Sequence, residues 1–114
     1  MKLDADLPKE IIQKAYEAIE IAKKTGKIKK GTNEVTKSLE RGMAKLVVVA
    51  KDVNPQEIIM HLPALCEEKN VPLIPVPSKE ELGAVVGLHV STVSVAIIEE
   101  GNAKHLIRDL SNLK

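Results

Sequence analysis

The chain has 114 residues, of which 44% are hydrophobic and 29% charged, and its net charge is +1. This length and balance predict one globular domain over residues 1–114 and exclude an intrinsically disordered chain. One cysteine excludes a disulfide framework, and one aromatic residue argues against binding of single-stranded nucleic acid by base stacking. No stretch approaches the roughly 18 apolar residues of a membrane span, so we expect a cytoplasmic protein without membrane contact.

Alternating helices and strands are predicted along the first half of the chain. Apolar residues at helical spacing predict a helix over 8–24, and after a basic stretch a second helix runs from Thr32 to Gly42. The β-branched run at 45–51 predicts a buried strand. Pro55 opens a third helix, whose apolar face carries Ile58, Ile59, Leu62, Leu65 and Cys66.

The second half continues the alternation. Residues 71–76 predict a strand that its prolines confine to an edge or a bulge. Ser78 and Glu81 form a capping box for a short helix that ends near Gly87. A third strand is expected over 93–100, and Asn102 is expected to cap a last helix. Together these elements predict an α/β fold in which helices cover both faces of a sheet.

Basic residues are concentrated between positions 23 and 51. This segment has nine lysines or arginines and two acids, hence a charge of +7, so the remainder carries −6. A chain polarised in this way presents one surface to a polyanion. A lysine-rich face that is merely solvated explains the charge equally well.

Catalytic and metal-binding motifs find little support. Gly26 and Gly31 have the spacing of a phosphate-binding P-loop, but Thr32 and Asn33 follow where Lys and Ser or Thr are required. The three histidines are scattered, and Cys66 has no partner at ligand spacing and fits a core position. We therefore expect no enzyme, no metal and no cofactor.

The second helix carries the most information. On a helical projection Asn33, Glu34, Lys37 and Arg41 fall within one arc, opposite an apolar stripe of Val35, Leu39 and Met43. Amide, carboxylate and cationic side chains are those that read base edges. The arc begins at a helix N-terminus, where free N–H groups favour phosphate. An amphipathic helix with a solvated polar face is the alternative, and periodicity alone favours it.

Several runs of sequence together resemble one family. They are KKGTNEVTK at 29–37, KLVVVAKDVNP at 45–55, HLPALCEEKNVP at 61–72, VPSK at 76–79 and LG at 82–83. In this order and spacing they resemble the archaeal large-subunit ribosomal protein of the seven-Ae type, which binds RNA kink-turns. The resemblance covers nearly the whole chain.

The resemblance implies a three-layer α/β/α sandwich with a small mixed sheet. It also implies a non-catalytic protein that is a monomer when free and recognises tandem sheared G·A pairs in a sharply bent RNA duplex. The expected partners are ribosomal RNA, box C/D and H/ACA guide RNAs, ribonuclease P RNA and other core proteins of these particles. The implied RNA-binding residues are Lys29, Lys30, Gly31, Thr32, Asn33, Glu34, Lys37, Arg41, Ile58, Lys79, Leu88, Val90 and Ser91.

Within this set the family assigns different roles. Asn33, Glu34 and Lys37 would contact the G·A pairs, and Gly31 and Thr32 would lie beside phosphates. Ile58, Lys79 and the loop over residues 88–93 would surround flipped-out nucleotides. His89 stands in this loop where the family usually has an acid.

Three alternatives stay open. The loop over residues 88–93 could instead be an early start of the following strand, broken by a bulge. The chain could be a protein–protein interaction module on the same fold. It could also belong to the related thirty-e type of ribosomal protein, which shares the fold and the mode of RNA binding.

Overall fold

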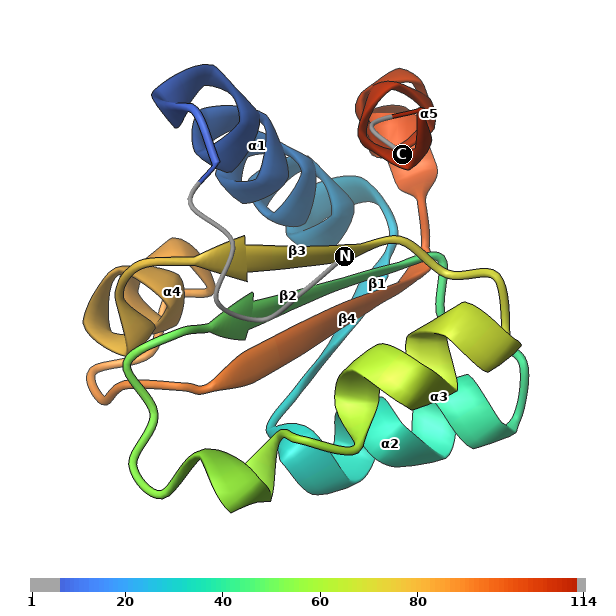
Figure 1. Cartoon of the computed structure of the whole chain (residues 1–114). Helices are drawn as coiled ribbons and strands as arrows, with labels where there is room; N and C mark the ends of the chain where they lie inside the picture. The colour runs from blue at the N-terminus through green and yellow to red at the C-terminus, as the bar shows by residue number, and fades with distance from the viewer. Residues whose placement is uncertain (1–6, 113–114) are drawn as a thin grey trace.

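A computed structural model describes residues 7–112 of the chain (Figure 1). The elements follow one another as α1 (Lys9–Thr25), β1 (Lys27–Lys30), α2 (Thr32–Glu40), β2 (Leu46–Ala50), the 3-10 turn η1 (Gln56–Ile58), α3 (Leu62–Glu68), β3 (Leu73–Val76), α4 (Lys79–Val85), β4 (Ser94–Glu99), the 3-10 turn η2 (Gly101–Ala103) and α5 (Lys104–Ser111).

The four strands form one mixed sheet in the order β1-β4-β2-β3. β4 pairs antiparallel with both β1 and β2, whereas β2 and β3 are parallel. β3 lies at the edge, as its prolines predict, because a proline has no N–H to donate to a second neighbour. β2, by contrast, is central and buried at every position.

Alternate residues of β2, β3 and β4 enter two separate cores. Val48 and its neighbours of the same face pack against α1, α4 and α5, and Val47 and Val49 pack against α2 and α3. Figure 1 shows α1 and α5 on one face of the sheet and α2 and α3 on the other, with α4 beyond the carboxyl ends of β2 and β3. The expected three-layer α/β/α sandwich with a small mixed sheet is confirmed. Each fully buried valine or leucine contributes about 1.5–3 kcal/mol of burial free energy.

The basic stretch at 27–30 is a strand, which the sequence did not indicate. Only Ile28 among its four residues packs against a core, so no alternating pattern is visible. Its backbone hydrogen bonds with β4 supply the order that its side chains do not.

The predicted third helix is wrong as one continuous element. A 3-10 turn ends at Ile58 and α3 begins only at Leu62, with Pro63 in its first turn. A helix running from Pro55 would place Pro63 in its interior, where the missing N–H and the ring clash break helices. Ile58 consequently leaves the apolar face and is 45% exposed.

Three further expectations change at element ends. Asn102 does not cap α5: it lies in η2, and its backbone N–H donates to the Thr25 hydroxyl at 2.9 Å. Met43 lies beyond the end of α2 and is 45% exposed, so it does not continue the apolar stripe. The Ser78 hydroxyl does cap α4 by accepting from the Glu81 N–H at 3.1 Å. The Glu81 carboxylate, however, accepts the Tyr16 hydroxyl instead of completing the box.

The chain over residues 88–93 is a loop, because β4 begins only at Ser94. The alternative of an early strand is therefore wrong. Among the described residues, no helix is long and apolar enough to cross a membrane.

Candidate nucleic-acid interface

The junction between β1 and α2 is fixed by the first residue of β4. The Gly31 N–H donates to the Ser94 carbonyl at 3.0 Å, and the hydroxyls of Thr32 and Ser94 lie 3.1 Å apart. Gly31 has φ of +92°, a conformation that glycine adopts without strain and other residues rarely do. The chain therefore turns sharply from the basic strand into α2 and holds the N-terminus of the helix in place.

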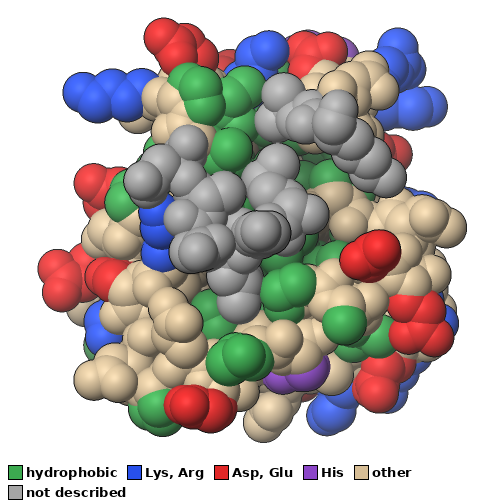
Figure 2. All heavy atoms as spheres, in the orientation of Figure 1, with side chains coloured by type: hydrophobic (Ala, Val, Ile, Leu, Met, Phe, Trp, Pro, Cys, Tyr) green, Lys and Arg blue, Asp and Glu red, His purple; other side chains and the backbone are tan. Residues whose placement is uncertain are grey.

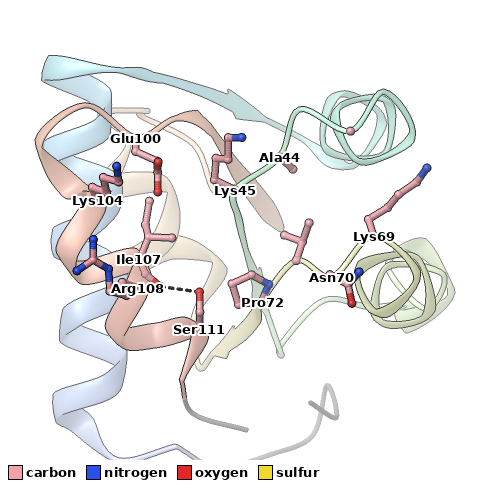
Figure 3. A pocket seen from close by; sticks show the side chains of 12 residues that line it. Ala44, Lys45, Lys69, Asn70, Pro72, Glu100, Lys104, Ile107, Arg108 and Ser111 are labelled. Atoms are coloured by element: carbon pink, nitrogen blue, oxygen red, sulfur yellow. Dashed lines mark hydrogen bonds between the residues drawn. The ribbon is translucent and has the colours of Figure 1, made fainter.

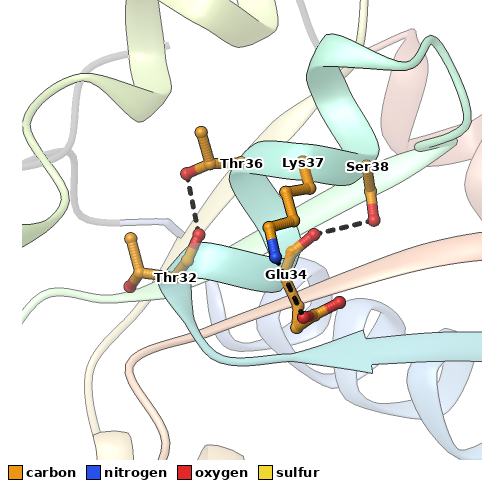
Figure 4. A network of polar contacts seen from close by, with 5 residues as sticks. All are labelled: Thr32, Glu34, Thr36, Lys37 and Ser38. Atoms are coloured by element: carbon orange, nitrogen blue, oxygen red, sulfur yellow. Dashed lines mark hydrogen bonds and ion pairs between the residues drawn. The ribbon is translucent and has the colours of Figure 1, made fainter.

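The predicted arc of α2 is at the surface. Asn33, Glu34 and Lys37 are exposed, whereas Val35 and Leu39 on the opposite side are fully buried. The Lys37 ammonium lies 3.8 Å from the Glu34 carboxylate (Figure 4). An exposed pair of this kind is worth only about 0.3–0.5 kcal/mol, so a ligand can replace it at small cost.

α2 is also fixed laterally. The Thr36 hydroxyl donates to the Thr32 carbonyl at 2.7 Å and lies 2.8 Å from His61 Nε2. Since its proton goes to the carbonyl, the hydroxyl is left to accept from His61, which places a proton on Nε2. This contact connects α2 to the start of α3.

The loop over residues 88–93 is fastened to α4 through backbone contacts. The Leu88 N–H donates to the Gly83 carbonyl at 2.9 Å, and the Thr92 N–H donates to the Lys79 carbonyl at 3.2 Å. A Cβ at position 83 would collide with the Val90 carbonyl oxygen. Glycine at position 83 thus lets the loop lie directly on the helix.

Lys79 is positioned from the opposite side as well. Its backbone N–H donates to the Asp52 carboxylate at 2.9 Å, which connects the start of α4 to the turn after β2. The Ala50 N–H in turn donates to the Val93 carbonyl at 2.9 Å. These bonds bring the turn, α4 and the loop together at one end of the sheet, the end at which α2 begins.

The apolar residues of the predicted site differ in exposure. Val90 is 70% exposed at the loop, and Ile58 is accessible on η1. Leu88 instead packs partly against the core on the α1 side of the sheet. Ser91 and His89 are exposed. Of the loop's apolar side chains, Val90 is therefore the one most available to a ligand.

A groove of about 420 Å³ runs between β1 and α2, and we call it the basic groove. It has five basic residues and one acid, Glu34. Lys27, one of the five, lies 3.3 Å from the Glu99 carboxylate. The lining residues are Lys23, Lys27, Ile28, Lys29, Glu34, Lys37, Ser38, Arg41, Met43 and Ile98.

Arg41 belongs to this groove rather than to the start of α2. It is the C-cap residue, eight positions after Asn33, so about 12 Å of helix separates the two. Lys30 is exposed at the end of β1 but does not line the groove. On the face shown in Figure 2, by contrast, basic and acidic side chains are interspersed around the rim rather than gathered in one patch.

Neither a set of metal ligands nor a reactive thiol is found in the part of the chain that the structure describes. Across residues 7–112, no three histidine, cysteine, aspartate or glutamate side chains converge as metal ligands. Cys66 is buried in the core between the sheet and α3, as predicted, and burial raises the pKa of its thiol to about 12. The thiol is therefore protonated at neutral pH and unreactive as a nucleophile.

Three residues that position the site were missed from the sequence. Ser94 fixes Gly31 and Thr32, Asp52 holds Lys79, and Gly83 admits the loop. A glycine within the predicted short helix was the one visible signal, since a glycine is unfavourable inside a helix and is kept there for packing or function. The contacts of Ser94 and Asp52 depend on tertiary structure alone.

Comparison with known proteins agrees with this geometry. The family model described as the ribosomal protein L7Ae/L30e/S12e/Gadd45 family matches residues 13–107. The structure of a Giardia lamblia 15.5kD RNA binding protein is similar, with a TM-score of 0.89 and 29% identity over 96% of this chain and 91% of that one. These comparisons confirm a non-catalytic protein. They do not distinguish the seven-Ae type from the thirty-e type, because one family model includes both. The chain belongs to the ribosomal protein L7Ae/L30e/S12e/Gadd45 family.

Proposed function

We propose that this protein binds RNA and recognises kink-turns as a structural component of ribonucleoprotein particles. The observation that carries the proposal is the exposed arc of Asn33, Glu34 and Lys37 on a helix whose start is fixed to the sheet. Ribosomal RNA, box C/D and H/ACA guide RNAs and ribonuclease P RNA are the proposed ligands. A cytoplasmic location, a free monomer and contacts with other core proteins stay predictions.

In this proposal the side chains of the α2 arc contact the base edges. The Asn33 amide can both donate and accept, the Glu34 carboxylate accepts from exocyclic amines, and Lys37 donates to guanine acceptors. Sheared G·A pairs differ from Watson–Crick pairs in the edges that they present, so this combination distinguishes a kink-turn from a regular duplex. The readout requires that RNA replace the weak Glu34–Lys37 pair.

Backbone contacts position the RNA without reading its sequence. Lys29 and Lys30 are exposed on β1, directly before the N-terminus of α2. Gly31 and Thr32 place the first N–H groups of that helix where phosphate is favoured. Arg41 and the basic groove extend the same attraction along the helix.

Unstacked nucleotides would be covered from the α4 side. Val90 and Ile58 offer exposed apolar surface. Polar groups come from Ser91, which follows Val90, and from Lys79, whose carbonyl accepts from the Thr92 N–H of the loop. Sequence-specific RNA recognition targets bulges and splayed bases rather than the deep groove of a regular duplex. Because Leu88 is partly buried, we assign it a smaller share of this contact than Val90.

Titration of the protein with two RNAs tests the proposal. One RNA carries a kink-turn, and the other has its G·A pairs changed to Watson–Crick pairs. A single good base-edge contact discriminates by about 1–3 kcal/mol and the arc offers three side chains, so we expect the kink-turn to bind at least tenfold more tightly. Equal affinity for the two RNAs at the same salt concentration would show that the protein reads only charge.

A further inference from the structure

A second basic surface lies at the other end of the sheet. A hollow of about 390 Å³ opens where β2 and β3 begin and β4 ends, between α5 and the ends of α2 and α3 (Figure 3). We call it the distal hollow. Its lining residues are Gly42, Ala44, Lys45, Lys69, Asn70, Val71, Pro72, Glu100, Lys104, Ile107, Arg108 and Ser111.

The net charge of the distal hollow is positive. Lys104 and Arg108 come from α5, Lys45 precedes β2, and Lys69 follows α3. Within the described part of the chain, none of the four forms an ion pair, and all four are exposed. Glu100 is the one acid among the lining residues.

The helix ends at the hollow do not cancel this charge. α2 and α3 both end there, and each C-terminus carries at most about half a negative charge. Several terminal carbonyls are already occupied, as when Leu65 accepts from the Lys69 N–H at 3.0 Å. Four bases, one acid and two such termini leave roughly +2, which attracts an anion.

The lining favours phosphate over other anions. Ile107 and Ala44 are buried, and Val71 and Pro72 are half-buried, so the lining has no exposed large apolar side chain to anchor a peptide. The large apolar side chains that are exposed in residues 7–112 lie outside the hollow. Tyr16, the one aromatic residue of the chain, is buried, so unstacked bases have no stacking partner there. Cations without apolar anchors or aromatic platforms suit a phosphodiester backbone.

We propose that the distal hollow binds the phosphodiester backbone of an RNA segment separate from the kink-turn. RNA as the polyanion rests on the proposed function. β4 begins beside the α2 site and ends beside the hollow, and its six residues span about 20 Å. The protein thereby connects two RNA segments, reading one and holding the other by charge.

The test uses two double variants of the full chain. Lys104→Ala/Arg108→Ala removes two charges from the hollow, and Lys9→Ala/Lys24→Ala removes two exposed charges from α1. Each protein is titrated with a plain RNA duplex and with a minimal kink-turn RNA. At about 50 mM salt we expect the hollow variant to lose fivefold or more in duplex affinity, with a salt slope shallower by about one to two. Its affinity for the minimal kink-turn and both affinities of the α1 variant should change less than twofold.

Other outcomes have definite meanings. Equal losses in the two variants, or no loss in either, would overturn the hollow as a site. The backbone amide resonances of Asn70 and Lys104 report on binding in the hollow. If they shift when a glutamate-rich peptide is added but not when duplex RNA is added, the RNA assignment is also overturned. Lys45→Ala/Lys69→Ala must give the same result as the first variant. In a further outcome, the parent protein binds the kink-turn and its Watson–Crick version equally while the hollow variant still loses duplex affinity. That result would reject the proposed function and leave the hollow as an RNA site.

Discussion

The two ends of the central sheet present basic surfaces of different construction. At the α2 end, Gly31, Ser94 and Gly83 constrain the backbone, so the exposed side chains project from a fixed frame. At the distal hollow, the cations are exposed side chains without ion pairs among the described residues. A fixed frame can select a shape, whereas exposed cations without ion pairs attract any phosphate backbone.

The largest effect is expected from removing the arc. Asn33→Ala, Glu34→Ala and Lys37→Ala should each reduce kink-turn affinity by about 1–3 kcal/mol, because each removes a base-edge contact. The triple variant should lose most of its preference for the kink-turn over plain duplex, and only the contact of Val90 with unstacked nucleotides should remain. Equilibrium titration measures this, with Glu40→Ala as a control on the same helix.

Thermal unfolding must accompany that titration. All three side chains are exposed, so the melting temperature should stay close to that of the parent. A folded triple variant with parental kink-turn affinity would contradict the account.

Gly83→Ala should damage the frame rather than the readout. The added Cβ collides with the Val90 carbonyl, so the loop must move, and overpacking of this kind costs about 1–3 kcal/mol of stability. The improved helix propensity of alanine offsets up to about 1 kcal/mol of that cost. The melting temperature and the affinity for the kink-turn should both fall, whereas Glu80→Ala on the same helix should leave both unchanged. Unchanged loop amide resonances in the variant would refute the close contact.

Val90→Ser and Leu88→Ser separate nucleotide contact from core packing. Val90 is 70% exposed, so its replacement should weaken kink-turn binding by about 1 kcal/mol with little change in stability. Leu88 packs partly against the core, so its replacement should mainly lower the melting temperature. If Leu88→Ser mainly weakened binding and Val90→Ser mainly lowered the melting temperature, the nucleotide contact would belong to Leu88 and the account would be wrong on this point.

The smallest effects concern single lysines. Lys29→Ala or Lys30→Ala should make the dependence of log affinity on log salt shallower by up to about one, since each removes one phosphate contact. The preference for the kink-turn over its Watson–Crick version should not change. A preference that fell with either lysine would mean that these residues read bases.

Local composition and spacing revealed part of the fold. A β-branched run predicted the buried strand β2, prolines predicted the edge position of β3, and helical periodicity predicted the two faces of α2. β1 was missed because three of its four residues are lysines and its order comes from pairing with β4. The break before α3 was readable from Pro63 but was overlooked.

The candidate site could likewise be predicted only in part. Asn33, Glu34 and Lys37 could be placed on one exposed face from helical geometry alone. The separation of Arg41 from the others depends on where α2 ends, and the burial of Leu88 on where the loop lies against α4. Contacts between residues far apart in the chain, such as Lys79 with Asp52, have no local signature.

Backbone amide chemical shifts during titration with a minimal kink-turn RNA test the central claim most directly. The account predicts that the amides of Gly31, Asn33, Lys37 and Val90 shift, and that those of Asn70 and Lys104 in the distal hollow do not. The shifts at Asn33 and Lys37 should disappear when the G·A pairs become Watson–Crick pairs. Shifts confined to the distal hollow, or shifts at Asn33 and Lys37 that are the same for both RNAs, would contradict it.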